Sequence, residues 1–200
     1  MYVLCREQKN KMISDEDKTN EDKVRANIAR NKRLRAIRYL NCIPKKHYIM
    51  TTRFNNKSHE EMISYCNKIK GVKCIYGVPK EIVGCVVKDS ILFVLEMNNE
   101  RNKIEGIGMV KNTAFPNRYG VYEEGNYNRF SYLGKARIDR SDMTEEEDTI
   151  LSAMDVICFK GKCHLKRSHG ITIFPQDVIE KCKTKMDLTD YIVNMFKRRL

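Results

Sequence analysis

The sequence predicts an α+β fold: a small, mainly antiparallel and strongly curved sheet or barrel with flanking helices, preceded by a basic helix. The stretch 90–112 reads as two strands joined by a polar turn, other short apolar segments are bounded by turn residues, and helix-capping patterns lie between them. The 200 residues suffice for one domain with an extension. We expect a basic helical extension over 1–46 and a compact domain over 47–200.

The extension differs from the rest of the chain in its charge. From Lys23 to Lys46 there are nine basic residues and no acidic one, and the first proline is Pro44. A helix is expected to begin near Glu21 and Asp22, because negative charge is favourable at a helix N-terminus. Its apolar stripe is narrow, so two interpretations stay open: a polyanion-binding arm, or a solvated helix docked on the domain by a few apolar side chains.

The compact domain is expected to begin with a strand over Tyr48–Phe54, which the polar residues 55–57 end. Ser58 is predicted to cap the following helix, since Ser58 and Glu61 have the spacing of a capping box. Gly71 should end this helix. The apolar face expected to pack on the sheet consists of Met62, Ile63, Cys66 and Ile69.

The central hairpin is the strongest local prediction. The apolar run Ile91–Leu95 is typical of a strand covered on both faces, and the polar residues 98–102 form the turn. The second strand contains Gly106 and Gly108. Glycine inside a strand indicates a bulge, or a place where another backbone or a ligand comes close.

The other elements follow from turn residues and capping patterns. Thr144 and Glu147 form a second capping box, which should open a helix that continues through Cys158. The remaining expected segments are a strand over 73–76, a turn over 77–79, a strand or extended loop over 82–87, one or two strands over 119–133 with a turn at 125–126, their extension over 135–138, a basic loop over 159–170, a strand over 171–174 and two closing helices.

The formal net charge of +12 and the pI near 9.3 favour a polyanionic partner, nucleic acid first and an anionic membrane second. The sequence shows no signal peptide and no apolar run long enough to cross a bilayer. We therefore expect an intracellular protein, cytoplasmic or nuclear or carried in a virion, without a membrane partner and with reduced cysteines.

Basic residues mixed with flat rings suit single-stranded nucleic acid, because cations contact the phosphates and rings stack on the bases. The segment 160–170 has this character, although a solvated surface loop would look similar. The residues predicted to contact nucleic acid are Arg30, Lys32, Arg33, Arg35, Arg53, Lys111, Arg118, Arg129, Lys160, Lys162, His164, Lys166 and Arg167. The residues predicted to form a base pocket are Tyr76, Gly77, Asn98, Gly106, Gly108, Asn112 and Tyr127.

No cofactor, metal site or catalytic residue is predicted. Cys158, Cys163, His164 and His169 are all possible zinc ligands, but the adjacent Cys163 and His164 would be difficult to aim at one ion. No CxxC pair occurs, and no nucleophile and base stand in a recognisable motif. The acidic run 145–148 is explained by a helix N-terminus.

The strand 48–54, the helix SHEEMISYCNKIK and the hairpin SILFVLEMNNERNKIEGIGMV together resemble the core of the PUA-like superfamily, above all its YTH and EVE branches. The later segment YNRFSYLGKARI is similar to the next strand of that core, so that the resemblance covers roughly 47–140, or up to 175. The resemblance implies a compact barrel with a groove that reads RNA or modified DNA bases. YTH domains hold methyladenine largely with tryptophan, and this chain has no Trp, so that specificity does not carry over.

We expect a non-catalytic nucleic-acid-binding protein, with RNA ahead of DNA. The Lys-, Asn- and Ile-rich character of the chain also resembles proteins of large DNA viruses. The alternative is therefore a structural or packaging protein of such a virus, whose arm binds the genome or acidic proteins. A third hypothesis, hydrolysis or deamination, follows from the resemblance alone, because some members of the wider superfamily carry out these reactions.

Overall fold

The computed structural model describes residues 22–32, 34–35, 46–82 and 84–200. The chain separates into two compact units, Met1–Asn41 and Cys42–Leu200. In the first unit, residues 22–32 and 34–35 are helical, as predicted, and their side chains are exposed. Apart from Lys46, the rest of the predicted arm lies outside the described residues. Of the described helices, none is both long enough and apolar enough to cross a bilayer.

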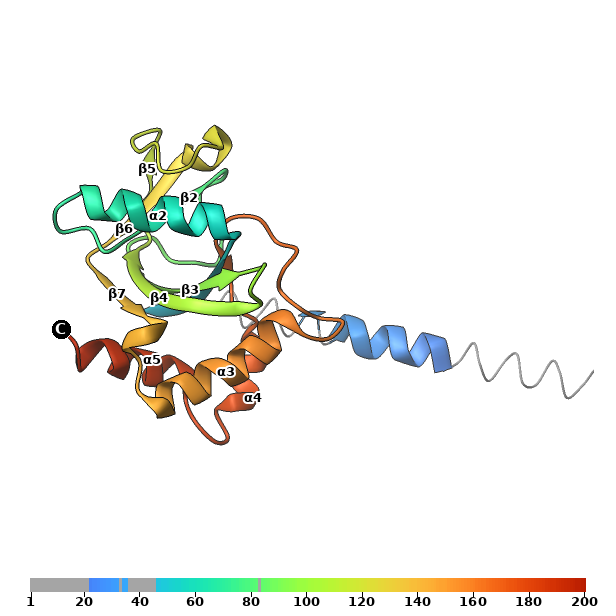
Figure 1. Cartoon of the computed structure of the whole chain (residues 1–200). Coiled ribbons are helices and arrows are strands. Elements are labelled where there is room, and N and C mark those ends of the chain that lie inside the picture. The colour runs from blue at the N-terminus through green and yellow to red at the C-terminus, as the bar shows by residue number, and fades with distance from the viewer. Residues whose placement is uncertain (1–21, 33, 36–45, 83) are drawn as a thin grey trace, which may run out of the picture. The chain divides into compact units, whose positions relative to one another are not determined.

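The larger unit is built on a mixed five-stranded sheet (Figure 1). Its strand order is β7-β4-β3-β1-β8; β1 and β3 are parallel and the other neighbours antiparallel. The prediction for the central hairpin is confirmed, because β3 is the middle strand and almost wholly buried. The strands are β1 (His47–Phe54), β3 (Ile91–Asn98), β4 (Lys103–Lys111), β7 (Ala136–Asp139) and β8 (Thr172–Ile173).

A second, three-stranded sheet has the order β2-β6-β5. Its strands are β2 (Cys74–Val78), β5 (Phe115–Pro116) and β6 (Phe130–Gly134). The chain passes from one sheet to the other where β6 runs through Lys135 into β7. The α+β class is confirmed, but the strands described form two separate sheets and not a closed barrel.

Two local predictions around this second sheet are wrong. Gly77 and Val78 were expected in a turn, but they continue β2 and pair with Ser131 and Phe130. One or two strands were expected over 119–133 with a turn at 125–126. Strand β6 is present and a 3₁₀ helix, η1 (Gly125–Asn128), lies at the expected turn, but residues 119–124 form no strand. At Gly77 and Val78 the pairing with β6 decides the backbone conformation.

The described residues of the larger unit also form a short 3₁₀ helix, η2 (Arg140–Asp142), and four α-helices: α2 (Asn56–Lys68), α3 (Glu145–Phe159), α4 (Gln176–Cys182) and α5 (Leu188–Lys197). The capping box of Thr144 and Glu147 is confirmed at α3. The cap predicted for α2 is wrong by three residues. Asn55 is the N-cap and Ser58 is the third helical residue, and the two exchange side-chain and backbone hydrogen bonds.

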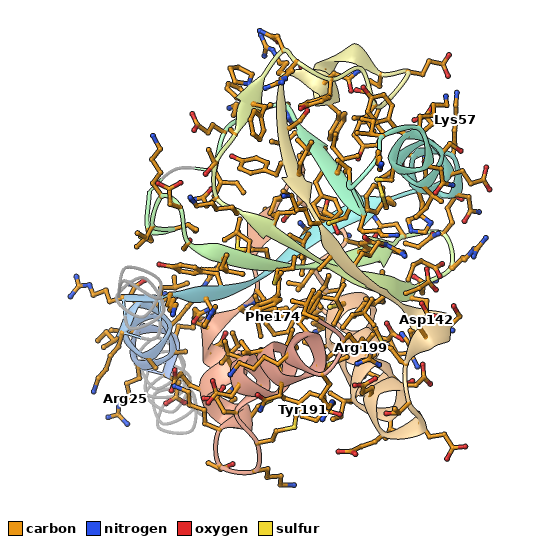
Figure 2. The ribbon with its side chains drawn as sticks, turned by 90° about the vertical axis from the view of Figure 1, so that its left-hand side faces the viewer. Arg25, Lys57, Asp142, Phe174, Tyr191 and Arg199 are labelled. Carbon is orange, nitrogen blue, oxygen red and sulfur yellow. The ribbon has the colours of Figure 1, made fainter. Side chains whose placement is uncertain are left out.

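The two faces of the five-stranded sheet bury separate cores. Helices α3, α4 and α5 cover one face, where Phe174 and Met195 are fully buried (Figures 1 and 2). Helix α2 and the three-stranded sheet cover the other, where Met62 and Tyr76 are fully buried. The carboxyl end of β1, from which the chain enters α2, lies at the edge of this second core.

The C-terminal residues are attached to the domain through Glu147, whose carboxylate accepts hydrogen bonds from Arg199 at 2.6 Å and Arg198 at 2.8 Å. The Arg199 guanidinium is the main cause that lowers the pKa of Glu147 to about 2 from an ordinary value of 4.5. A carboxyl group whose pKa is lower in the folded state stabilises the fold above its ordinary pKa, and this contribution is lost as the pH falls toward the folded value.

We therefore expect Glu147→Gln to lower the free energy of unfolding at pH 7 by on the order of 1 to 2 kcal/mol, because exposed Arg198 is partly screened by water. The difference from the native chain should stay constant above about pH 5 and shrink toward pH 2. Urea unfolding of both proteins across this pH range measures the difference in free energy of unfolding. If this difference is the same at pH 3 and pH 7, the negative charge of Glu147 is not what stabilises the fold.

Candidate functional site

A groove of about 690 Å³ opens where β1 ends and α2 begins. Besides these elements, it is lined by Gly77 of β2 and by two loops that are distant in sequence, 122–127 and 166–169. Its lysines and arginines outnumber its carboxylates. The cationic residues are Arg53, Lys57, Lys166 and Arg167, the acidic ones are Glu61, Glu123 and Glu124, and His169 also lines the groove.

Arg53 holds the basic loop against the end of β1. Its Nε donates to the carbonyl oxygen of Leu165 at 2.9 Å, and its Nη1 donates to the hydroxyl of Thr172 at 2.6 Å. Burial lowers the pKa of Arg53 to about 10, so the side chain is still a cation at neutral pH. Lys166 and Arg167 directly follow this anchored position and line the groove, and the Lys166 ammonium donates to Oδ1 of Asn102 at 2.8 Å.

Two tyrosines form the aromatic side of the groove. The ring centroids of Tyr122 and Tyr127 lie 6.5 Å apart with planes at 78°, an edge-to-face arrangement. Gly77 allows this segment to approach β2, because a Cβ at that position would lie 2.2 Å from the carbonyl oxygen of Tyr127. The Tyr127 hydroxyl lies 3.3 Å from Nδ1 of His169, and Glu123 pairs with Lys57. The tyrosine loop is thus connected to α2 and to the basic loop.

Asn99, in the turn after β3, places an amide at the groove. Its Nδ2 donates to the carbonyl oxygen of Lys166 at 3.2 Å, and its backbone amide donates to Phe54 at 2.8 Å. The Asn99 Oδ1 is buried without a hydrogen-bond partner among the described residues. A buried acceptor of this kind is costly unless a ligand or water pairs with it.

The base pocket predicted around the strand glycines is not there. A Cβ on Gly108 would lie 1.8 Å from the Tyr76 hydroxyl, and one on Gly106 would lie 2.9 Å from Nη2 of Arg137. The glycines therefore make room for core side chains and not for a ligand. The register of β4 does shift beside Gly106: Leu95 pairs with Ile107 and Met97 with Ile104, so that β4 has one residue more than β3 at this place.

The two asparagines predicted for the same pocket are also buried, and both serve local structure. Asn98 donates to the side chain of Asn56 at 2.9 Å and accepts backbone amides of its own turn. Asn112 donates to the carbonyl oxygens of Val86 and Val87. Of the seven predicted pocket residues, only Gly77 and Tyr127 line the groove.

The predicted phosphate contacts are likewise divided. Arg53, Lys166 and Arg167 line the groove, whereas the other predicted residues of the larger unit do not. Lys57 was missed by sequence reasoning, although a position just inside a helix N-terminus is a recognisable signal. The predicted phosphate contacts that lie away from the groove are Lys111, paired with Asp89; Arg118, stacked on Phe115 and Tyr119; half-buried His164; and exposed Arg129, Lys160 and Lys162.

In the first unit Arg30, Lys32 and Arg35 are exposed on the helix, and Arg33 lies outside the described residues. Arg30, Lys32 and Arg35 belong to the other compact unit and do not line the groove.

A fully buried carboxylate, Glu96, lies in the core behind the groove. It accepts hydrogen bonds from the Tyr76 hydroxyl at 2.7 Å and from Arg137 Nη2 at 2.8 Å, and Nε2 of His59 lies 3.3 Å away. Burial alone would raise the pKa of Glu96, but the hydrogen bonds of His59, Arg137 and Tyr76 together outweigh burial and lower it. Because Tyr76 and Arg137 donate hydrogen bonds to both of its oxygens, Glu96 acts as a structural anion.

The described residues contain no group of three or more His, Cys, Asp or Glu side chains arranged to hold a metal ion. Comparison of the chain with protein-family models, curated proteins and solved structures gave no match.

Proposed function

We propose that the protein binds single-stranded nucleic acid in the groove without chemical conversion, and that RNA is preferred over DNA. The observation that carries the proposal is the meeting of Lys57, Lys166 and Arg167 with Tyr122 and Tyr127 in one hollow of about 690 Å³. This volume is in the range of small-ligand pockets, roughly 300–1,000 Å³, and accommodates a nucleobase with its sugar. Cations beside rings are the usual means of holding a single strand.

Each group has a separate role in this proposal. Lys57, Lys166 and Arg167 contact phosphates, and a phosphate at Lys57 takes the place of the Glu123 carboxylate. Tyr127 supplies a face on which a base stacks. The unpaired Oδ1 of Asn99 accepts a hydrogen bond from a base amino group, which would provide selectivity.

Four lysine and arginine residues of one loop give a matched test. Lys166 and Arg167 line the groove, whereas Lys160 and Lys162 are exposed outside it. We expect Lys166→Gln/Arg167→Gln to weaken binding of a single-stranded RNA and to flatten the slope of log affinity against log salt by about 1.4, or about 0.7 for each phosphate contact. Fluorescence anisotropy at several salt concentrations measures both quantities.

The control variant Lys160→Gln/Lys162→Gln removes the same charge and should leave the slope unchanged. Equal flattening by the two variants would contradict binding in the groove, because it would show that only net charge matters. No change in either variant would exclude this loop as a phosphate contact.

A packaging role is the second candidate, and the exposed basic side chains of residues 22–32 and 34–35 favour it. An arm of this kind binds any polyanion through charge. The two functions differ in selectivity. A groove that reads a base prefers a polynucleotide that contains one particular modified or unmodified base, whereas a packaging arm binds every polynucleotide alike.

A further inference from the structure

A second hollow, of about 650 Å³, lies at the other end of α2. It is lined by the C-terminal turn of α2 and the loop that follows, by β7 and by the end of α5. Figure 1 shows that α2 runs from the end of β1 to this side, where the chain's C-terminus also lies, and in Figure 2 this side faces the viewer. We call it the lysine hollow, after Lys70, Lys73 and Lys135 at its rim.

The surplus charge of the lysine hollow comes from these three lysines, which outnumber Asp142, the lining carboxylate that remains once Asp139 is paired with Arg137. The two arginines that also line it are engaged by carboxylates, Arg137 by Glu96 and Asp139, and Arg199 by Glu147. The three lysines are exposed, and none forms an ion pair with another residue in the described part of the chain. Their ammonium groups are available to an external anion.

Part of the lining of the lysine hollow is apolar. Ile63, Ile69 and Val72 are half-buried and line the hollow together with the lysines, and we call these three residues its apolar floor. A flat ring that carries a phosphate matches this combination, because the ring covers the apolar floor while the phosphate reaches a lysine. An inorganic anion would leave the floor uncovered.

The exposed face of α2 connects the two sites. Its exposed residues recur at helical spacing: Lys57, Glu60, Ser64, Asn67 and Lys68. Helix α2 has 13 residues, so the distance between its ends is about 20 Å at about 1.5 Å per residue. A stacked strand covers this distance in roughly six nucleotides at about 3.4 Å each.

We propose that the lysine hollow is a second nucleotide-binding site for the same single strand, reached along α2 from the groove. This inference depends on the proposed function of the groove. It predicts a dependence on length: an oligonucleotide of about four residues occupies the groove alone, and one of about twelve also reaches the lysine hollow.

The test compares Lys70→Gln/Lys73→Gln/Lys135→Gln with a control of equal charge, Lys88→Gln/Lys160→Gln/Lys185→Gln, whose lysines are exposed outside both hollows. The first variant should bind the long RNA more weakly, with a salt slope flatter by up to about 2, and bind the short RNA as the native chain does. The control should change neither. Circular dichroism and the urea midpoint verify that both variants fold.

Equal behaviour of the two variants toward the long RNA would overturn the second site. Binding of polyglutamate that depends on Lys70, Lys73 and Lys135, without any effect on the long RNA, would also overturn it and assign the hollow to an acidic protein partner. The groove is tested separately by the short RNA: if Lys166→Gln/Arg167→Gln leaves its binding unchanged, the proposed function fails, whatever happens at the lysine hollow.

Discussion

Replacing Arg137 with Met is expected to lower the free energy of unfolding by about 3 to 5 kcal/mol, the usual cost of leaving a buried charge without its partner. Glu96 has no exposed side-chain surface, and the Arg137 side chain is only 9% exposed. Three hydrogen bonds join the two groups at 2.8 to 3.1 Å. His59 and Tyr76 would remain, but neither supplies the permanent charge of a guanidinium. Urea unfolding at pH 7 measures the loss.

A double-mutant cycle separates the charge from the packing. In Glu96→Gln/Arg137→Met the uncompensated carboxylate is gone, so part of the stability lost in Arg137→Met should return. Arg101→Met is the surface control, because its pair with Glu105 is largely exposed on the arginine side and should be worth less than about 1 kcal/mol. If the double variant is no more stable than Arg137→Met, the stabilisation comes from packing of the arginine and not from its charge.

The buried carboxylate of Glu96 was not predicted from the sequence. Nothing in the sequence around Glu96 distinguishes it from a residue at a solvent-exposed strand position. Its partners come from α2, β2 and β7, and only the folded chain brings them together. The central hairpin, in contrast, was predicted correctly because an apolar run, a polar turn and a second run are adjacent in sequence. Local information was sufficient there.

The same distinction explains the errors about the site. A glycine at position 108 can make room either for a ligand or for a large side chain in the core. The Tyr76 hydroxyl occupies this space in the fold, which the sequence alone does not show. At α2, Asn55 and Ser58 are both good caps, and the end of the pairing between β1 and β3 at Phe54 favours the earlier one. The groove depends on two loops that meet at the end of β1, and no sequence pattern predicts that meeting.

Lys166 and Arg167 were nevertheless recognised, because a basic segment with rings stands out in composition alone. Composition does not show which basic residues lie in the same groove as an aromatic ring. Lys166 and Arg167 do, whereas Lys160 and Lys162 lie outside the groove. In the proposed function, binding of a base therefore depends on the aromatic side of the groove and on Asn99 more than on the charge of the groove.

Replacing Tyr127 with Ala is expected to weaken the binding of single-stranded RNA by about 5- to 150-fold, which corresponds to about 1 to 3 kcal/mol for one stacked base. The salt slope should stay at its native value, because no phosphate contact is lost. This combination is the opposite of that expected for Lys166→Gln/Arg167→Gln. Fluorescence anisotropy titrations at several salt concentrations distinguish the two.

Two further variants make the result specific to the ring. Tyr127→Phe keeps the stacking face and loses only the contact of the hydroxyl with His169, so it should retain most of the affinity. Tyr119→Ala removes a ring that packs on Phe115 and Arg118 outside the groove, and should bind as the native chain does. If Tyr127→Ala and Tyr119→Ala lose the same affinity, no base stacks on Tyr127, and the groove binds the strand through its phosphates alone.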